Sequence, residues 1–172
     1  IGSQSERMGY EPRSTPDLLL DAMNEVRGFW SEQFSYLGPL RDDPKVIFAA
    51  PTDLDRRNVG AKGEYTAALL TERGDSLVSY PPPPSKGKYA LPSPKEATLV
   101  NAVIIWLKHM GLVDEIKTRE LTKVGYELTV QSVGLDKRHD LMNVGAGVSQ
   151  ILPTIVACLI APKGSTIVLD EP

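Results

Sequence analysis

Two acidic residues follow a short apolar run near the C-terminal end of the sequence. Residues 166–169 read Thr-Ile-Val-Leu, and Asp170 and Glu171 come directly after them. Such a run predicts a buried parallel strand, and α/β sheets bind ligands beyond the C-terminal ends of their strands. One carboxylate there can hold Mg²⁺, and a second can orient or deprotonate a water. We therefore expect Asp170 to be a metal ligand and Glu171 to be catalytic; two incidental acids are the alternative.

A glycine-containing turn lies upstream of these acids. Gly145 and Gly147 predict a backbone that takes positive φ and approaches a ligand closely. Ser149 predicts a helix N-cap, the apolar run 151–161 a buried helix, and Gly164 the C′ position that ends it. The start of a helix offers unpaired N–H groups and a partial positive charge, which suit an anion. This unit indicates phosphate binding, and an ordinary helix start is the alternative.

The order of the two units resembles a known arrangement. Gln150 precedes Asp170 by twenty residues (170 − 150), with one helix and one strand between them. This spacing and the wording Leu-Asp-Glu-Pro resemble the signature motif, signature helix and Walker B motif of ABC-type ATPases. A closer resemblance is to the OLD-like and SMC-like group of AAA-family ATPases, some of which belong to anti-phage systems such as Septu. It is carried by segments 36–41 (YLGPLR), 59–65 (VGAKGEY) and 144–153 (VGAGVSQILP), the last continuing to residue 172.

The resemblance implies an α/β fold, namely the C-terminal lobe of an ABC-type P-loop ATPase head, with a mixed sheet and packed helices. It implies ATP and Mg²⁺ as cofactors and a homodimer of two heads around two nucleotides. Asp170 and Glu171 would act on the nucleotide of their own head. The motif residues that would bind the γ-phosphate held by the opposite protomer are Gly145, Gly147, Ser149 and Gln150. Arg41 would contact phosphate or the other lobe; a surface arginine in a loop is the alternative.

The expected organisation is a mobile end at 1–13 and a single partial ABC-type ATPase domain at 14–172. Within that domain, 144–153 is the signature motif and 166–171 the Walker B motif. The phosphate loop Gly-x-x-x-x-Gly-Lys-Ser/Thr does not occur in the sequence. We therefore expect the lobe of a split head, cut at both sides, whose partner is the missing P-loop lobe. Alone, it is expected to bind ATP weakly and hydrolyse none.

Composition bounds these expectations. The 172 residues can bury one moderate core, and the net charge of −3 argues against a broad DNA-binding face. Nucleic acid stays open as a partner, because a local basic patch can exist within an acidic average. Cys158, the single cysteine, is expected to be a packed core thiol in a reducing cytoplasm. The longest apolar stretch is too short to span a membrane, so no membrane role is expected.

The remaining sequence predicts the elements that position these residues. Apolar spacing predicts helices at 16–32, 64–73 and 94–110, and alternation predicts strands at 34–37, 124–131 and 141–144. Residues 42–63 are expected to be a long loop, 81–84 an extended polyproline connection, and 135–140 a polar turn. No coiled-coil heptad run is expected, so any SMC-like arm would lie outside these residues.

A second class of function fits the same residues. The chain would then be a catalytically inactive scaffold or interaction module, and its partner a nuclease or toxin. A phosphate loop encoded before Ile1 would favour the ATPase, and its absence would favour the scaffold. A generic α/β protein with incidental acids is the third interpretation.

Overall fold

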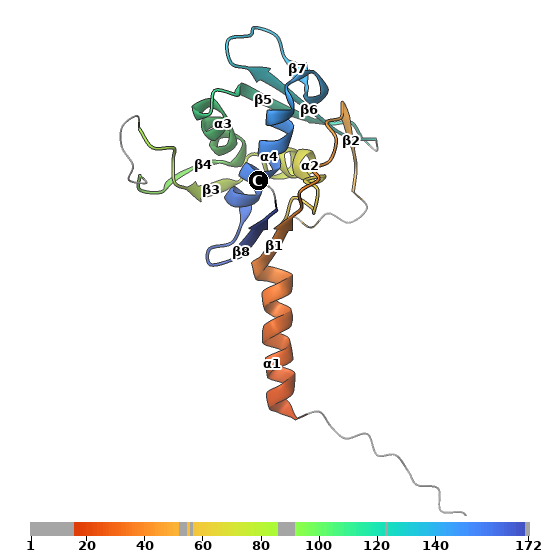
Figure 1. Ribbon diagram of the computed structural model, residues 1–172, viewed down its shortest axis with the longest axis vertical. Coiled ribbons are helices and arrows are strands. Elements are labelled where there is room, and N and C mark those ends of the chain that lie inside the picture. Colours follow the sequence, from red (N-terminus) through yellow and green to blue (C-terminus); the bar gives the residue numbers. More distant parts are fainter. Residues whose placement is uncertain (1–15, 52–54, 56, 86–91, 123, 171–172) are drawn as a thin grey trace, which may run out of the picture.

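Three small β-sheets and four α-helices make up the part of the chain that the structure, a computed structural model, describes (Figure 1). That part comprises residues 16–51, 55, 57–85, 92–122 and 124–170. The fold is therefore mixed α/β, as the sequence predicts. The strands form three separate sheets instead of one mixed sheet. The expected mobile end at 1–13 lies outside the described residues.

The first sheet joins two segments from opposite ends of the chain. Strand β1 (Phe34–Leu37) pairs in parallel with β8 (Thr166–Leu169), so that Phe34 lies beside Thr166 and Leu37 beside Leu169. Both strands are confirmed at their predicted positions. β8 is not the doubly buried central strand that its composition predicts, since its residues alternate between exposed and half-buried. Only β1 pairs with it among the described strands.

The second sheet is antiparallel and was only partly predicted. β6 (Gly125–Ser132) is confirmed, and it pairs with β2 (Ile47–Ala49), β5 (Val113–Glu120) and β7 (His139–Asp140). β2 lies inside the expected 42–63 loop. The expected strand at 141–144 is wrong, because Leu141–Asn143 form a 3₁₀ turn. β2 forms because it pairs with β6, a tertiary contact that its local sequence does not reveal.

Helix α3 (Leu99–His109) begins later than the predicted 94–110 helix, because the first residues of that range form a strand of the third sheet. β3 (Leu77–Tyr80) pairs with β4 (Lys95–Thr98), and the proline run leaves β3 directly. Helix α3 therefore begins only after β4. Thr98 caps it, since the Thr98 hydroxyl accepts a hydrogen bond from the Asn101 N–H.

The core lies between the second sheet and three helices: α2 (Thr66–Arg73), α3 and α4 (Ala146–Ile160). Leu69, Leu107 and Leu128 are fully buried there, one each from α2, α3 and β6. α4 carries an apolar face into this core, as predicted. Cys158 departs from its prediction: it lies on the outer side of α4 and is exposed.

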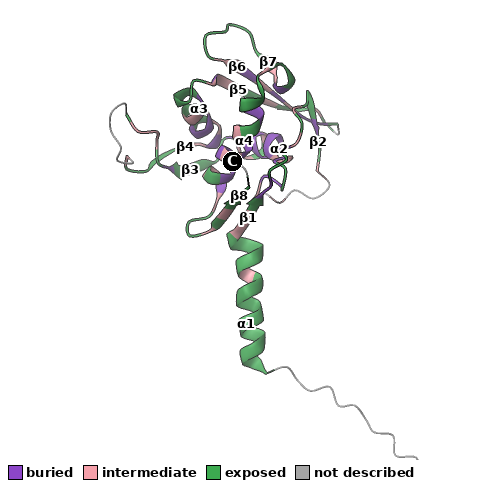
Figure 2. Ribbon diagram, viewed as in Figure 1, coloured by how far each residue is buried: buried purple, intermediate pink, exposed green. Residues whose placement is uncertain are grey.

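Helix α1 (Asp17–Gly28) stands apart from that core. A π-helical turn, Phe29–Gln33, continues it to β1, and together they project from the body as one rod (Figure 1). The predicted helix at 16–32 is thus confirmed in position. Its apolar stripe does not face a core, because α1 has no buried residue (Figure 2).

One close contact fixes the 60–63 turn against α4. Gly63 has φ of +76°, and a Cβ added there would lie 2.6 Å from the Cβ and Cγ atoms of Pro153. Pro153 stands in the middle of α4, where it leaves one helical carbonyl without its usual N–H partner. Its ring instead fills the space that the glycine leaves open.

We predict that Gly63→Ala lowers the free energy of unfolding by about 2–4 kcal/mol, because it adds overpacking against Pro153 to left-handed backbone strain. Gly111→Ala is the matched control: Gly111 has φ of +73° but open space around its Cβ position. It should cost about 1–2 kcal/mol, the strain alone. Urea denaturation measures both, and equal losses would refute the packing contact.

Candidate functional site

The C-terminal ends of β1 and β8 meet at the same edge of their sheet. The Asp170 N–H donates to the Leu37 carbonyl at 3.0 Å, which extends the parallel pairing by one residue. The Tyr36 hydroxyl donates to the Asp170 Oδ2 at 3.1 Å. Asp170 is exposed. Glu171, the predicted catalytic residue, lies outside the described residues.

The electrostatics of Tyr36 report on this edge. The hydrogen bond to Asp170 raises the pKa of Tyr36 above its ordinary value, and partial desolvation and the negative charge of Asp170 act in the same direction. The positive charge of Arg41 opposes them. These three side chains therefore lie within electrostatic range of one another, although the sequence analysis did not single out Tyr36.

Arg41 is the unusual member of this group. It is only 8% exposed, and its Nε and Nη1 atoms are buried without a hydrogen-bond partner among the described residues. A buried charged donor without an acceptor is costly, because it has lost water without gaining a replacement. The alternative interpretation, an arginine on a surface loop, is therefore wrong. The guanidinium is instead enclosed by the protein, with two of its nitrogen atoms lacking an acceptor.

A folded loop holds the segment that carries Arg41. The Gly38 N–H donates to the Ala61 carbonyl at 2.7 Å, and the Asp42 N–H donates to the Lys62 carbonyl at 2.8 Å. These two bonds flank Arg41 on either side and fix its backbone against the 60–63 turn.

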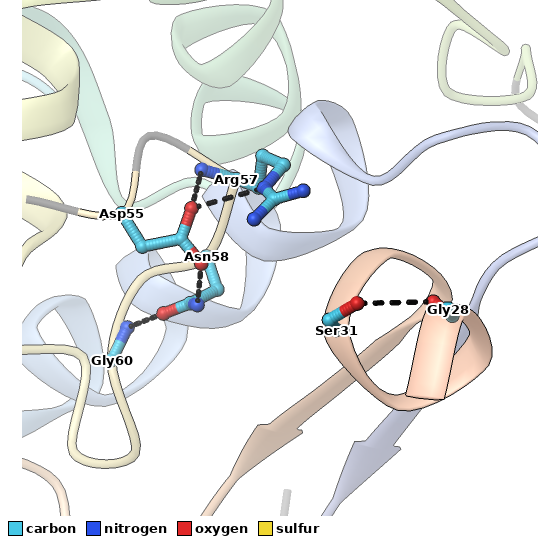
Figure 3. A network of polar contacts seen from close by, with 6 residues as sticks. All are labelled: Gly28, Ser31, Asp55, Arg57, Asn58 and Gly60. Atoms are coloured by element: carbon cyan, nitrogen blue, oxygen red, sulfur yellow. Dashed lines mark hydrogen bonds and ion pairs between the residues drawn. The ribbon is translucent and has the colours of Figure 1, made fainter. Parts of the chain in front are cut away.

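That turn has a polar network of its own (Figure 3). The Asp55 carboxylate accepts from the backbone and side chain of Arg57 and from the Asn58 amide. Asn58 in turn accepts from the Gly60 N–H at 2.9 Å. Aspartate and asparagine thus build the turn through local side-chain bonds to the backbone. The acidic and basic residues of this loop hold its shape.

The start of α4 differs from its prediction. The helix begins at Ala146 with Gly145 at the N-cap position, and Ser149 lies in the first turn. The Ser149 hydroxyl donates to the Ala146 carbonyl at 2.8 Å, and the residue is 8% exposed. It lines a small cavity of about 20 Å³ beside Lys62 and Thr66. The prediction of Ser149 as an N-cap is therefore wrong.

The glycines of this turn serve a different purpose from the one predicted. Gly145 has φ of −52°, and Gly147 is helical, so neither uses positive φ. Both are exposed, with open space around them, as is Gln150. No side chain of these two glycines covers the start of α4, and the Val148 N–H there already donates to the Gly145 carbonyl at 3.1 Å.

The end of α4 also comes earlier than predicted. Ala161 is extended, because a residue before proline avoids the helical region, and the helix ends at Ile160. Gly164 does have a left-handed φ of +86°, but it lies in the following turn, where the Ser165 N–H donates to the Pro162 carbonyl. The C′ assignment of Gly164 is therefore wrong.

The structure thus forms two clusters from the predicted residues. Asp170 and Arg41, with Tyr36, lie at the β1–β8 edge, and Gly145, Gly147 and Gln150 lie at the start of α4. The two clusters are not joined to each other: among the described residues, no hydrogen bond connects Asp170 to the first turn of α4. Lys62, which the sequence analysis did not select, lies beside Ser149. Lys62 belongs to segment 59–65, one of the three segments that carry the resemblance to the ATPase group, and this was the only sign in the sequence that it lies near the site.

Asp170 suits Mg²⁺ in one particular way. No group of three His, Cys, Asp or Glu residues in the described ranges is arranged to hold a metal. Mg²⁺ commonly uses one or two carboxylates together with water and substrate phosphates. Asp170 offers one such carboxylate, and Mg²⁺ bound there would share the remaining positions with water or phosphate oxygens.

Comparisons of the chain with models of known families, with curated proteins and with solved structures found no match. None of the described helices has the length and apolarity needed to cross a bilayer.

We predict that Asp170→Asn lowers the pKa of Tyr36 toward the ordinary value near 10, because it removes the charged acceptor that holds the hydroxyl proton. In the native protein the raised pKa favours folding below pH about 10, and this contribution is lost as pH rises through the folded-state value. Carbon-13 NMR titration of the Tyr36 ring measures the shift. Asp140→Asn, at a half-buried position in β7, should leave it unchanged. An unaltered titration in Asp170→Asn would contradict the hydrogen bond.

Proposed function

We propose that this chain is part of an ABC-type ATPase head of the OLD-like and SMC-like group, which binds and hydrolyses ATP with Mg²⁺ as a head-to-head homodimer. One observation supports this most strongly. A buried arginine without an acceptor and an exposed aspartate lie within electrostatic range of one tyrosine, at the strand ends where α/β sheets bind ligands. An anion accompanied by a cation satisfies both groups at once, and ATP·Mg is such a pair.

The first cluster would serve the nucleotide of its own head. Asp170 would hold Mg²⁺, directly or through water, and Arg41 would neutralise phosphate charge. Glu171 follows Asp170 in the sequence and would orient or deprotonate the attacking water. The phosphate loop that holds the nucleotide would come from the other lobe of the head. Tyr36 would keep one oxygen of Asp170 engaged and so orient the carboxylate.

The second cluster would serve the nucleotide of the opposite head. Gly145, Gly147 and Gln150 present the uncovered first turn of α4 to solvent, and its N–H groups would contact the γ-phosphate. The Ser149 hydroxyl already bonds within the helix. Ser149 would therefore shape this turn and leave the phosphate contact to the backbone.

The two clusters together describe a gate. Two heads would be joined by shared triphosphates and would separate once hydrolysis removes the γ-phosphates that bridge them. DNA-related work or anti-phage defence is the setting that the resemblance suggests. The partner that responds to the joined or separated heads would be nucleic acid, a nuclease or a toxin.

We predict that Gly147→Arg abolishes ATP-driven dimerisation, because a long side chain would cover the exposed N–H groups and occupy the phosphate position. The site tolerates the substitution sterically, since an added Cβ meets no atom within 4 Å. Size-exclusion chromatography of the full-length protein, with and without ATP·Mg, gives the readout. Val133→Arg adds the same group at another exposed position and should dimerise normally. Persistence of the ATP-dependent dimer in Gly147→Arg would disprove the second cluster.

We predict that Arg41→Met raises the thermal stability of the ligand-free protein, because it removes a buried charge without an acceptor. The same change should weaken ATP·Mg binding on the order of tenfold to 100-fold, as expected for a charge-assisted hydrogen bond. Calorimetric titration of the full-length protein and its melting temperature provide both readouts. Lys45→Met removes an exposed charge that pairs with Asp42 in the same segment and is the control. Unchanged ATP affinity in Arg41→Met would rule out a phosphate contact.

The scaffold is the second candidate function, and one observation favours it. The rod formed by α1 and its π-helical turn offers an apolar face that the described body of the chain leaves uncovered. A protein with this rod and no ATP hydrolysis would be an interaction module for a nuclease or toxin. Turnover of ATP by the full-length protein distinguishes the two candidates.

A further inference from the structure

The α1 rod carries seven large apolar side chains that are exposed in the described structure. Leu19, Met23, Val26 and Trp30 follow one another at intervals of four, three and four residues, the spacing of a two-helix seam. We call these four residues the α1 seam. Leu20 and Phe29 flank it. Each of these side chains and the neighbouring Leu18 is between 37% and 79% exposed.

The rod is stiff at its base. Trp30 packs on Phe34 of β1 with ring centroids 4.5 Å apart, and on Phe29 at 5.7 Å. The Ser31 hydroxyl donates to the Gly28 carbonyl across the change from α to π geometry (Figure 3). These contacts fix the direction in which α1 leaves the body. The far part of α1 has no such support, and a lone helix of this length is marginal in water.

The exposed apolar area of the rod is large enough to be an interface. Taking about 100–250 Å² for a whole large side chain, the exposed fractions leave on the order of 700 Å² of apolar surface. Monomeric proteins seldom expose a patch above about 600 Å², and a stable interface buries about 800 Å² per partner. One apolar helix face of equal size is therefore enough to cover it.

Charge narrows the choice of occupant. The side of α1 away from the seam carries Asp17, Asp21 and Glu25, with Glu32 in the π-helical turn, against one Arg27. A helix that lies on an anionic membrane needs a basic polar side. A second copy of the same helix meets no such conflict, since the acidic residues point away from the seam.

We infer that the α1 seam pairs with the α1 seam of a second copy of this chain, in antiparallel orientation. The pair is centred between Met23 and Val26, so that each Met23 packs on the second copy's Val26. Each Leu19 then packs on the second copy's Trp30. Large residues thus face smaller ones, which fills the seam evenly, and the helix dipoles oppose each other favourably. In this orientation the two bodies lie at opposite ends of the helix pair.

This pairing is independent of the proposed function, because it requires no nucleotide. The ATP-driven contact would join the bodies, whereas the α1 contact joins the rods. The experiment is therefore done without nucleotide and with EDTA present, and a failure here leaves the ATPase proposal intact.

Sedimentation velocity of the full chain over a range of concentrations tests the inference. The native protein should form a dimer, and Met23→Lys should raise its dissociation constant on the order of 100-fold or more, since it places charge on both sides of the seam. Asn24→Lys makes the same substitution one residue outside the seam and should dimerise like the native protein. A native monomer at all concentrations, or equal effects of both variants, would overturn the inference. So would binding to anionic phosphatidylglycerol vesicles that Met23→Lys abolishes.

Disulfide trapping tests the orientation. In a Cys158→Ser background, which removes the exposed native thiol, Met23→Cys and Val26→Cys proteins are mixed and oxidised. Antiparallel pairing predicts that the mixed 23–26 product forms faster than the 23–23 product. A dominant 23–23 product would show parallel helices and overturn the arrangement. Because all these positions are exposed in the single chain, the variants are expected to fold.

Discussion

The parallel pairing of β1 with β8 is the constraint on which the candidate site depends. It joins segments more than 120 residues apart, and its register sets Leu37 beside Leu169. This register places Asp170, which follows β8, beside β1: the Asp170 N–H donates to the Leu37 carbonyl, and the Tyr36 hydroxyl of β1 donates to the Asp170 carboxylate. A shift of one residue would turn Tyr36 to the other face of the sheet. The chemistry of this edge is therefore a property of the register, which neither strand determines alone.

The same pairing explains why Arg41 is buried. The chain leaves β1 at Gly38, where an added Cβ would lie 3.2 Å from the Ala61 carbonyl oxygen, so the segment is pressed against the 60–63 turn. That turn is in turn locked to α4 through Gly63 and Pro153. Arg41 lies between two backbone hydrogen bonds of this contact and is 8% exposed. The buried charge thus accompanies tight packing of the segment that carries it.

The sequence predicts the elements of this fold better than the roles of their residues. β1, β6, β8 and the apolar face of α4 follow from local patterns, because alternation and apolar spacing reflect burial directly. β2, β3, β4 and β5 were missed, as was β7, which lies at the end of the expected 135–140 turn, since each of these strands depends on a partner strand. Ser149 has the right residue type for an N-cap, yet the N-cap position is taken by Gly145, four residues earlier. At the site, Asp170 was predicted from composition, whereas the partnership with Tyr36 needs three dimensions.

The α1 rod also shows that a local pattern predicts an element better than it predicts what that element contacts. Its apolar spacing predicts a helix correctly, and ordinary reasoning then assigns that face to the core. The core is already complete without it: α2, α3, α4 and the second sheet close around Leu69, Leu107 and Leu128. The spacing of apolar residues shows that a helix has an apolar face. It does not show whether that face packs on the same chain or on another. The body has its own packed interior, so the apolar face of the rod is not needed to complete it. α1 continues through its π-helical turn directly into β1, which contains Tyr36 and precedes Arg41. A partner bound to the rod would therefore be linked through the backbone to the strand that positions these two residues.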